Sequence, residues 1–264
     1  MLARVWPAIG WAAAAAIIVI LSVAVITYYF GIINPPSPVT GQLKTPRDQA
    51  DLNWAGYTAA YSFSDPKPVV TGVSGSWVVP QIAYSENDTY SALWVGIGGI
   101  FGHTLIQTGT EQDCVDGAIS YSAWYELLPS DSVVIPTMDL SPGDTIAASI
   151  NLAVPSMDMW TISLSDLSTG QGFQQDFHYD SSRLSAECVV ERPDLDNNTM
   201  TNIANFGKVM FSNCTATMND ITSAFGYMPS SRLFMYDTEG SRLADVSTLS
   251  NDKSSFTITY IKSQ

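Results

Sequence analysis

Two polar residues stand in apolar, strand-like parts of this sequence, and their chemical types suit each other. Gln107 lies within residues 105–109, and Glu191 ends residues 186–191. Strand interiors avoid Gln and Glu, because burying a polar side chain without a partner costs free energy. Such residues therefore either face water or take part in a reaction.

An amide and a carboxyl group together meet the needs of amide hydrolysis. The reaction requires a base that activates water and a donor that stabilises the oxygen on which negative charge develops. Glu191 can take the proton of the water and later return it to the leaving amine. The side-chain amide of Gln107 can donate to the tetrahedral oxygen, and it needs no charge to do so. Gln107 and Glu191 are therefore a candidate catalytic pair. For Gln107 taken alone, a glutamine that hydrogen-bonds to a neighbouring strand is the alternative.

Residues 186–191 carry a second carboxylate, Glu187. Side chains alternate along a strand, so Glu187 and Glu191 face one side and Cys188 the other. An edge strand whose charges prevent aggregation would explain both carboxylates without any chemistry. A glycan-binding or glycan-cleaving sandwich is the alternative function. Its carboxyl groups need a separation of roughly 5–9.5 Å, whereas these two residues lie about 13 Å apart along an extended strand.

Further motifs set these residues in a wider pattern. In chain order they are NWAGY at 53–57, SGSWVVP at 74–80, WVGIGG at 94–99, QTG at 107–109 and YSAWYE at 121–126. Together with AECVVE at 186–191, this order and spacing resembles the glutamic peptidase family, whose members are also called eqolisins.

The resemblance implies an acid-active endopeptidase that cleaves polypeptides without a metal, another cofactor or a covalent intermediate. It gives the two catalytic places to Gln107 and Glu191. It also implies a sandwich of two bent antiparallel sheets, concanavalin A-like or jelly-roll-like, with the substrate lying across the concave face. Further residues expected to line or support the substrate cleft are Trp54, Trp94, Glu126 and Glu187.

The sequence departs from the family pattern at two places. Gly98 stands where the family often carries Asp, and Leu127 and Leu128 stand where aromatic residues are common. These departures leave the cleavage preference open, although the catalytic pair is intact.

Signatures of other hydrolases are missing from the sequence. It contains no Asp-Thr-Gly or Asp-Ser-Gly, no Gly-x-Ser-x-Gly and no His-Glu-x-x-His. The two histidines, His103 and His178, do not have metal-ligand spacing. We therefore expect no metal and no other cofactor.

Beyond residue 51 the sequence predicts an all-β domain. Short alternating segments are broken by Gly, Pro, Asn, Asp and Ser, without helical periodicity, which favours a sandwich or barrel. The candidate strands are 72–79, 91–97, 104–110, 121–127, 145–153, 160–166, 172–178, 184–191, 208–217, 232–236 and 255–261. Residues 167–171 resemble a hairpin turn with a glycine at positive φ. Residues 194–205 are interpreted as a loop or a short helical turn.

The charge of the chain excludes some partners. Its 25 acidic and 11 basic residues give a net charge of −14. Nucleic acid and anionic lipid surfaces both attract clusters of Lys and Arg, and none is present. With so few basic groups, self-repulsion in acid would be modest, which permits tolerance of an acidic exterior.

The N-terminus predicts a membrane segment. No charged residue occurs from Val5 to Ile33, and residues 11–30 are almost wholly apolar. Twenty residues at about 1.5 Å each span the roughly 30 Å of a bilayer core. Ser22-Val23-Ala24 could be a signal-peptidase site, but the apolar run continues beyond it, which favours an uncleaved anchor.

The chain is therefore expected to have three parts: a signal anchor at 1–33, a Pro-rich linker at 34–51 and the peptidase domain at 52–264. We expect a monomeric, single-pass protein of the cell membrane with its catalytic domain outside the cell. Cleavage of the N-terminal segment would instead give a secreted enzyme.

Three cysteines, Cys114, Cys188 and Cys214, allow at most one intramolecular disulfide. Cys188–Cys214 is the favoured pairing because it would join two strands. Three free thiols are the alternative.

Overall fold

A computed structural model describes residues 46–195 and 199–263. Within them the backbone forms eighteen strands and three short 3₁₀ helices. The strands are β1 (Arg47–Asp51), β2 (Trp54–Ala60), β3 (Val70–Val78), β4 (Thr89–Ile97), β5 (Ile106–Val115), β6 (Ala118–Leu127), β7 (Val133–Val134), β8 (Thr145–Val154), β9 (Met159–Asp166), β10 (Gly172–His178), β11 (Ser185–Glu191), β12 (Asp194–Leu195), β13 (Thr199–Met200), β14 (Lys208–Met218), β15 (Ile221–Ala224), β16 (Ser230–Tyr236), β17 (Arg242–Val246) and β18 (Phe256–Tyr260). The 3₁₀ helices are η1 (Gly99–Phe101), η2 (Pro155–Met157) and η3 (Phe225–Tyr227).

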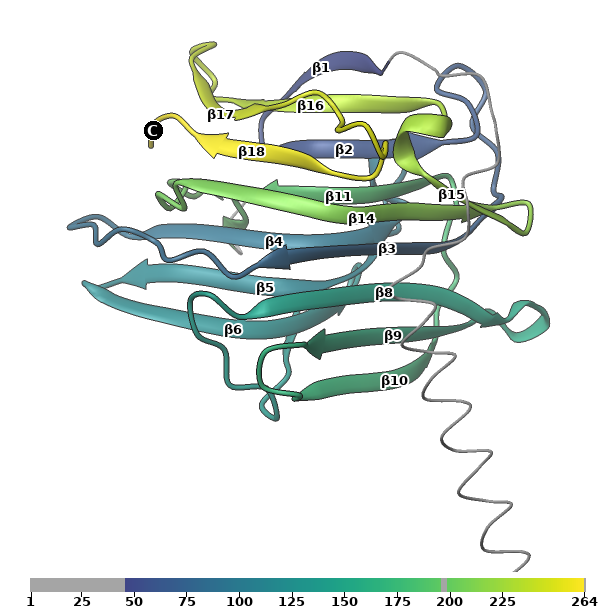
Figure 1. The fold of residues 1–264 in the computed structure, drawn as a ribbon, viewed down its shortest axis with the longest axis horizontal. Helices are drawn as coiled ribbons and strands as arrows, with labels where there is room; N and C mark the ends of the chain where they lie inside the picture. Colours follow the sequence, from purple (N-terminus) through teal and green to yellow (C-terminus); the bar gives the residue numbers. More distant parts are fainter. Residues whose placement is uncertain (1–45, 196–198, 264) are drawn as a thin grey trace, which may run out of the picture. The chain divides into compact units, whose positions relative to one another are not determined.

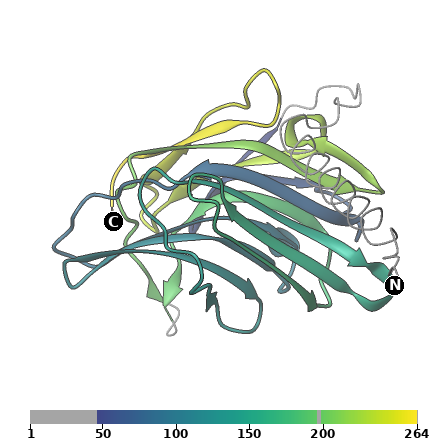
Figure 2. The same ribbon diagram turned by 60° about the horizontal axis from the view of Figure 1, so that its bottom comes forward.

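The strands make a sandwich of two layers (Figure 1). One layer runs from β10 through β9, β8 and β3 to β14, and the other from β7 through β6, β5, β4, β11 and β2 to β16. Strand β14 joins the layers, because its first residues pair with β18 and its later residues pair with β3. A register shift between Ser212 and Thr215 marks this bend. Figure 2 shows that both layers are curved.

The core lies between the layers and is built from alternate residues of their strands. Trp77, Trp160 and Phe211 are among its largest buried side chains. A second apolar cluster covers the opposite face of the β4–β11 layer, with Trp94 and Val189 at its centre. Strand β4 therefore has apolar residues on both of its faces, and residues 92–95 form a continuous hydrophobic run.

The predicted all-β sandwich is confirmed, and each of the predicted strands is present with small differences at its ends. The hairpin turn between β9 and β10 is also present, with Gly170 at φ +79°. Residues 194–195 and 199–200 form the short β12–β13 pair, where a loop or helical turn was expected. The prediction missed several strands, namely β1, β2, β7, β12, β13, β15 and β17.

Strand β1 comes from the segment predicted as a linker. It pairs in parallel with β16, an exception to the expected antiparallel pairing. Two bonds from the Arg232 guanidinium to the Asp48 carboxylate, of 2.9 and 2.8 Å, hold β1 there. This planar pairing of two donors with two acceptors suits arginine.

The predicted membrane anchor at 1–33 and most of the predicted linker lie outside the described residues. In the described part of the chain, no helix has the length and apolar character needed to cross a bilayer. The division into anchor, linker and domain therefore stays a prediction.

The favoured Cys188–Cys214 disulfide is wrong, because all three cysteines are free and buried. The fold nevertheless brings these two thiols together. A Cβ placed on Gly75 would lie 3.2 Å from Cys188 Sγ and 3.7 Å from Cys214 Sγ.

Candidate active site

Strand register places the predicted site residues on one face of one layer. Gln107 on β5 lies opposite Gly96 on β4, and Gly96 lies opposite Glu187 on β11. Four residues further along β11, Glu191 lies opposite Ala92 of β4. Directly paired residues share a face, and so do residues an even number of positions apart. Gln107, Glu187 and Glu191 therefore share the face that points away from the sandwich core.

Gln107 is almost fully buried on this face, with 4% of its surface exposed. Its Nε2 donates a hydrogen bond to Oε2 of Glu126, the residue opposite it on β6. Its Oε1 has no hydrogen-bond partner among the described residues. A side-chain amide has two N–H donors, so one remains for another acceptor. Gln107 is thus held in place and still able to donate.

Glu191 ends β11 and is partly exposed. Its Oε2 accepts a hydrogen bond of 2.7 Å from Trp94 Nε1. Burial raises the pKa of Glu191 to about 7, while the indoles of Trp54 and Trp94 oppose the rise and the charge of Glu126 adds to it. The carboxyl group therefore holds a proton in acid and can release it near neutral pH.

The Trp94 indole spans the space between these two residues. Its Nε1 meets Glu191, and its six-membered ring covers Gly96, where a Cβ would lie 2.7 Å from Trp94 Cζ3. Gly96 is the direct neighbour of Gln107. Trp54, opposite Glu191 on β2, packs edge-on against Trp94 with ring centroids 5.0 Å apart. The two tryptophans predicted for the cleft therefore lie next to the Glu191 carboxyl group.

Glu126 interacts with both Gln107 and Glu191. It accepts the bond from Gln107, and its charge raises the pKa of Glu191. Burial raises the pKa of Glu126 itself, although the bond from Gln107 opposes this. No hydrogen bond joins Gln107 to Glu191 among the described residues, and their backbones lie two strands and four residues apart, about 16 Å in a flat sheet. Gln107 and Glu191 therefore do not hydrogen-bond to each other, and the Trp94 indole lies between them.

Glu187 has a different environment from Glu191 although it shares its strand face. It is fully buried, and neither carboxyl oxygen makes a hydrogen bond of ordinary geometry within the described residues. Burial raises its pKa to about 8, and the Ser185 hydroxyl and the backbone amides of residues 98–100 oppose this only in part. A sealed carboxyl group cannot act with Glu191 on a sugar, so the pair does not fit glycoside cleavage.

Two more acidic residues on this face were missed by the sequence analysis. Glu111 and Asp113 follow Gln107 along β5 at even spacing, so they share its face. Burial raises the pKa of Asp113 to about 8, and the neighbouring Glu111 adds to the rise. Burial and the charge of Glu126 also raise the pKa of Glu111. The predicted strand ended at residue 110, whereas β5 continues to Val115, so alternation was not applied to either residue.

The two departures from the family pattern have structural correlates. Gly98 has φ +114°, where a side chain is strained, and a Cβ there would lie 2.6 Å from Thr104 O. An Asp would therefore not fit this backbone just before η1. Leu128 packs against the apolar cluster around Trp94.

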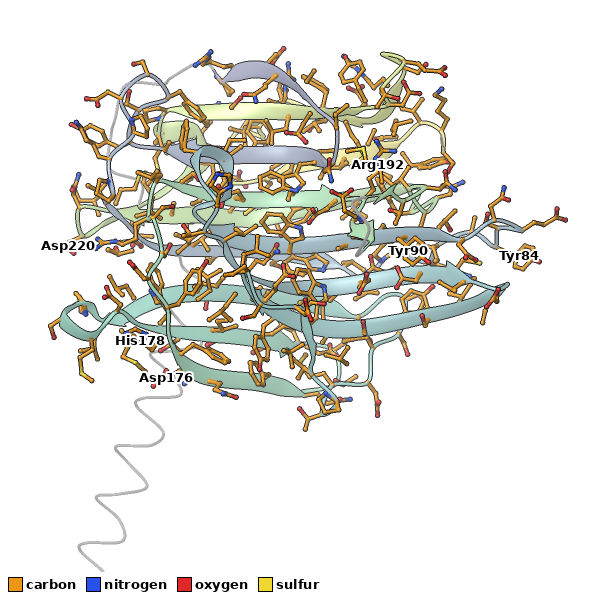
Figure 3. All side chains as sticks on the ribbon, turned by 180° about the vertical axis from the view of Figure 1, so that it is seen from behind. Tyr84, Tyr90, Asp176, His178, Arg192 and Asp220 are labelled. Atoms are coloured by element: carbon orange, nitrogen blue, oxygen red, sulfur yellow. The ribbon has the colours of Figure 1, made fainter. Side chains whose placement is uncertain are left out.

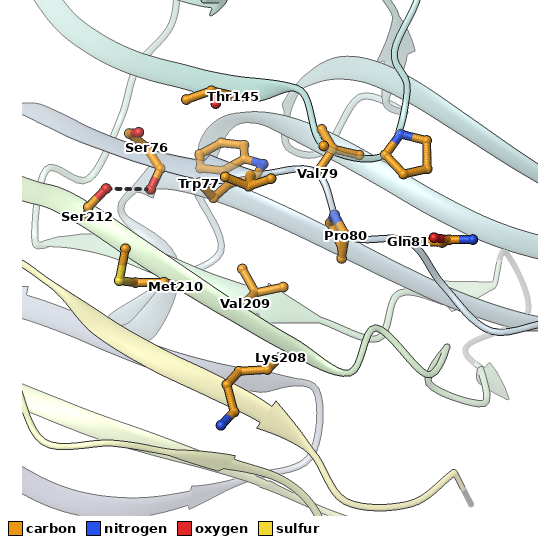
Figure 4. Close-up of a pocket in the computed structure, with 13 residues that line it drawn as sticks. Ser76, Trp77, Val79, Pro80, Gln81, Thr145, Lys208, Val209, Met210 and Ser212 are labelled. Atoms are coloured by element: carbon orange, nitrogen blue, oxygen red, sulfur yellow. Dashed lines mark hydrogen bonds between the residues drawn. The ribbon is translucent and has the colours of Figure 1, made fainter. Parts of the chain in front are cut away.

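In the ranges that the structure describes, no group of three or more His, Cys, Asp or Glu could hold a metal ion. Both histidines, His103 and His178, are exposed. Figure 3 shows His178 at the end of the molecule opposite Tyr90. The other layer carries a pocket of about 570 Å³ lined by residues of β3 and β14 (Figure 4), and none of the predicted site residues line it.

The chain is similar to proteins of known activity. The family model described as the Peptidase A4 family matches residues 52–260. Aspergillopepsin-2 from Aspergillus niger is 30% identical over 243 residues, which are 82% of this chain and 80% of that protein. Scytalidopepsin B from Scytalidium lignicola is 30% identical over 155 residues, 57% of this chain and 55% of that protein.

Solved structures give the same picture. The crystal structure of aspergilloglutamic peptidase from Aspergillus niger has a TM-score of 0.58 at 28% identity, covering 66% of this chain and 99% of that chain. Scytalido-glutamic peptidase with a transition state analog inhibitor has a TM-score of 0.67 at 23% identity, covering 80% of this chain and 99% of that chain. The second likeness concerns the fold alone and agrees with the two-layered sandwich.

Proposed function

Because this chain belongs to the peptidase A4 family and is a glutamic peptidase, we propose that it is an acid-active endopeptidase whose catalytic pair is Gln107 and Glu191. The support that carries this proposal is their shared strand face, on which one residue offers an uncharged donor and the other a carboxyl group with a raised pKa. These are the two functions that amide hydrolysis requires.

Glu191 would handle the protons of the reaction. With a pKa of about 7 its carboxyl group is protonated in acid. As water attacks the substrate carbon, one carboxyl oxygen takes a proton from the water while the other gives its proton to the carbonyl oxygen. When the tetrahedral intermediate breaks down, Glu191 gives a proton to the leaving amine and recovers one from the hydroxyl group. It therefore ends in the state in which it began.

Gln107 would stabilise the tetrahedral oxygen. Its bond to Glu126 fixes the amide plane, so the remaining N–H is oriented before the substrate arrives. An amide keeps this ability at any pH, unlike a donor that must be charged.

We also propose that residues 1–33 anchor a monomeric enzyme in the cell membrane with the sandwich domain outside. The uncharged apolar run supports this placement. Extraction of membranes with alkaline carbonate tests it, because an anchored chain stays with the membrane and a secreted one is released.

A casein assay tests the peptidase proposal. The full-length protein is incubated with denatured casein between about pH 2 and 7, beside Glu191→Gln and Gln107→Ala. We expect cleavage that is strongest in acid and lost in both variants. Full activity in both variants, or hydrolysis of polysaccharide without proteolysis, would contradict the catalytic pair.

A further inference from the structure

Arg192 follows Glu191 directly, and its side chain is among the largest that are fully buried in the described residues. Figure 3 labels it near the end of β11. Burial lowers the pKa of its guanidinium, while the charges of Asp194 and Asp237 oppose this. A buried arginine needs hydrogen-bond acceptors to offset its lost hydration. The hydrogen bonds of Arg192 therefore indicate its role in the structure.

The contacts of Arg192 join two segments of the chain. Its Nε donates to Leu52 O over 3.0 Å, and its backbone N–H donates to Asn53 O over 3.0 Å. On the other side, Nη1 donates to Thr201 O over 3.3 Å, and Nη2 contacts Met200 Sδ at 3.0 Å. The Arg192 side chain thus links Leu52, just before β2, to Met200 at the end of β13 and to Thr201.

The segment held by Arg192 sets the position of Trp54. Leu52 and Asn53 immediately precede Trp54, the first residue of β2. On their other side, Asp51 Oδ1 accepts from the backbone N–H groups of Asn53 and Trp54, both over 2.9 Å. These two bonds restrict the backbone at the start of β2. The hydrogen bond from Arg192 to Leu52 O restricts it further.

Trp54 lies beside the Glu191 carboxyl group. It lies opposite Glu191 in register and packs edge-on against Trp94, which donates to Glu191. Both indoles lower the pKa of Glu191. A displaced Trp54 would therefore change both the geometry and the proton affinity of that carboxyl group.

We propose that Arg192 is a positioning residue for Glu191: its guanidinium holds Leu52 so that the Trp54 indole stays against the carboxyl group. The inference rests on the proposed catalytic role of Glu191. Lysine would not reproduce these contacts, because all its donors share one nitrogen, whereas the guanidinium reaches the two segments from separate nitrogens, Nε and Nη1.

Arg192→Lys in the full-length protein tests the inference, with Arg183→Lys as the matched control. Arg183 also donates its Nε to a backbone carbonyl, Val70 O at 3.1 Å, but at the opposite end of β11. We expect Arg192→Lys to lower kcat about 10–100-fold with KM nearly unchanged, as for a small misplacement of a catalytic group. The control should lose some thermal stability and keep kcat.

The pKa of Glu191 can be followed in the pH–rate profile. A purely structural role of Arg192 would leave this pKa unchanged. Losing the Trp54 contact removes a group that lowers the pKa of Glu191, so the basic limb of the pH–rate profile should shift upward. Trp54→Phe should give the same shift, and the double variant should shift no further than either single variant. The inference would be overturned if Arg192→Lys kept the wild-type kcat and the wild-type basic limb of the pH–rate profile. Fully additive shifts in the double variant would overturn it as well.

A pH titration of tryptophan fluorescence separates this inference from the proposed function. Ionisation of Glu191 beside two indoles should change their emission, and Glu191→Gln should abolish that transition. Its midpoint should rise in Arg192→Lys even if other residues prove to be catalytic; an unchanged midpoint would refute the positioning role. If the lysine variant does not fold, Arg192→Gln, whose amide can still donate to one carbonyl, takes its place with the same expected shift.

Discussion

The two carboxyl groups of β11 lie four residues apart on one strand face, yet their surroundings differ. Glu191 stands at the strand end, is partly exposed, and accepts a bond from Trp94. Glu187 stands in mid-strand beside the η1 turn, is fully buried, and lacks an ordinary hydrogen bond among the described residues. Burial raises the pKa of both groups, to about 7 and about 8. A raised pKa alone therefore does not single out a carboxyl group as catalytic; Glu191 differs from Glu187 in its partial exposure and in the bond it accepts from Trp94.

The strongest test of this contrast substitutes each carboxyl group by an amide. We expect Glu191→Gln to lower kcat by about 10³-fold or more, because both proton transfers would be lost. Glu187→Gln should keep most of the activity, because its carboxyl group is sealed and already protonated in acid. The measurement is casein cleavage at acidic pH. Equal losses in the two variants would mean that the contrast between the two ends of β11 has no functional meaning.

Stability against pH probes the buried end of β11. The folded pKa of Glu187, about 8, lies above its ordinary value of 4.5, so its contribution is complete below about pH 4.5 and is lost as the pH rises toward 8. For one fully buried carboxyl group the loss is on the order of 5 kcal/mol. Glu191 and Asp113 act in the same direction, since their pKa values are raised as well.

We therefore expect Tm to be highest in acid and to fall toward neutral pH. Glu187→Gln should flatten that fall, because an amide has no proton to lose. Scanning calorimetry of both proteins across this range makes the comparison. A Tm that rises from pH 4 to pH 8 in the wild type would contradict the assigned environment of Glu187.

Two glutamines on β5 allow the same kind of comparison, between a site-facing and a core-facing residue, for the side-chain amide group. Gln107 faces the site, whereas Gln112 faces the core, where its Nε2 donates to Thr110 Oγ1 over 2.8 Å. Gln107→Ala should cost about 10²–10³ in kcat, the usual loss for one oxyanion donor. Gln112→Ala should lower Tm and leave kcat nearly unchanged. If Gln112→Ala lowered kcat and Gln107→Ala did not, Gln107 would not be the amide donor of the reaction.

The sequence was sufficient to predict the face of β11, because alternation along a strand is a local property. The spacing of Glu187 and Glu191 placed both side chains on one face, and the pairing of β11 with β4 confirms it. The hairpin at Gly170 followed from turn chemistry for the same reason. Local rules could not show that η1 covers one carboxyl group and not the other. That difference depends on contacts between segments far apart in the chain.

Strand β1 and Arg192 were missed for a related reason. Residues 47–51 are mostly polar and mostly exposed, so no hydrophobic alternation marks them, and their pairing with β16 joins distant parts of the chain. Arg192 is buried by the segments around residues 52 and 201, and an arginine after a carboxylate gives no sign of this in sequence.

The smallest effect concerns the indole bond that distinguishes Glu191 from Glu187. Trp94→Phe keeps the ring but removes the N–H that donates to Glu191 Oε2. The pKa of Glu191 should rise, because the carboxylate loses a donor; bonds to charged groups are worth about 1.5–3 kcal/mol, or one to two pH units at most. The basic limb of the pH–rate profile should therefore move upward, with a kcat loss of about tenfold or less. Trp77→Phe is the matched control, since Trp77 Nε1 donates to Thr110 Oγ1 over 3.0 Å within the core. It should lower Tm and leave the limb in place; a limb that moves equally in both variants would show that the Trp94 bond does not set the pKa of Glu191.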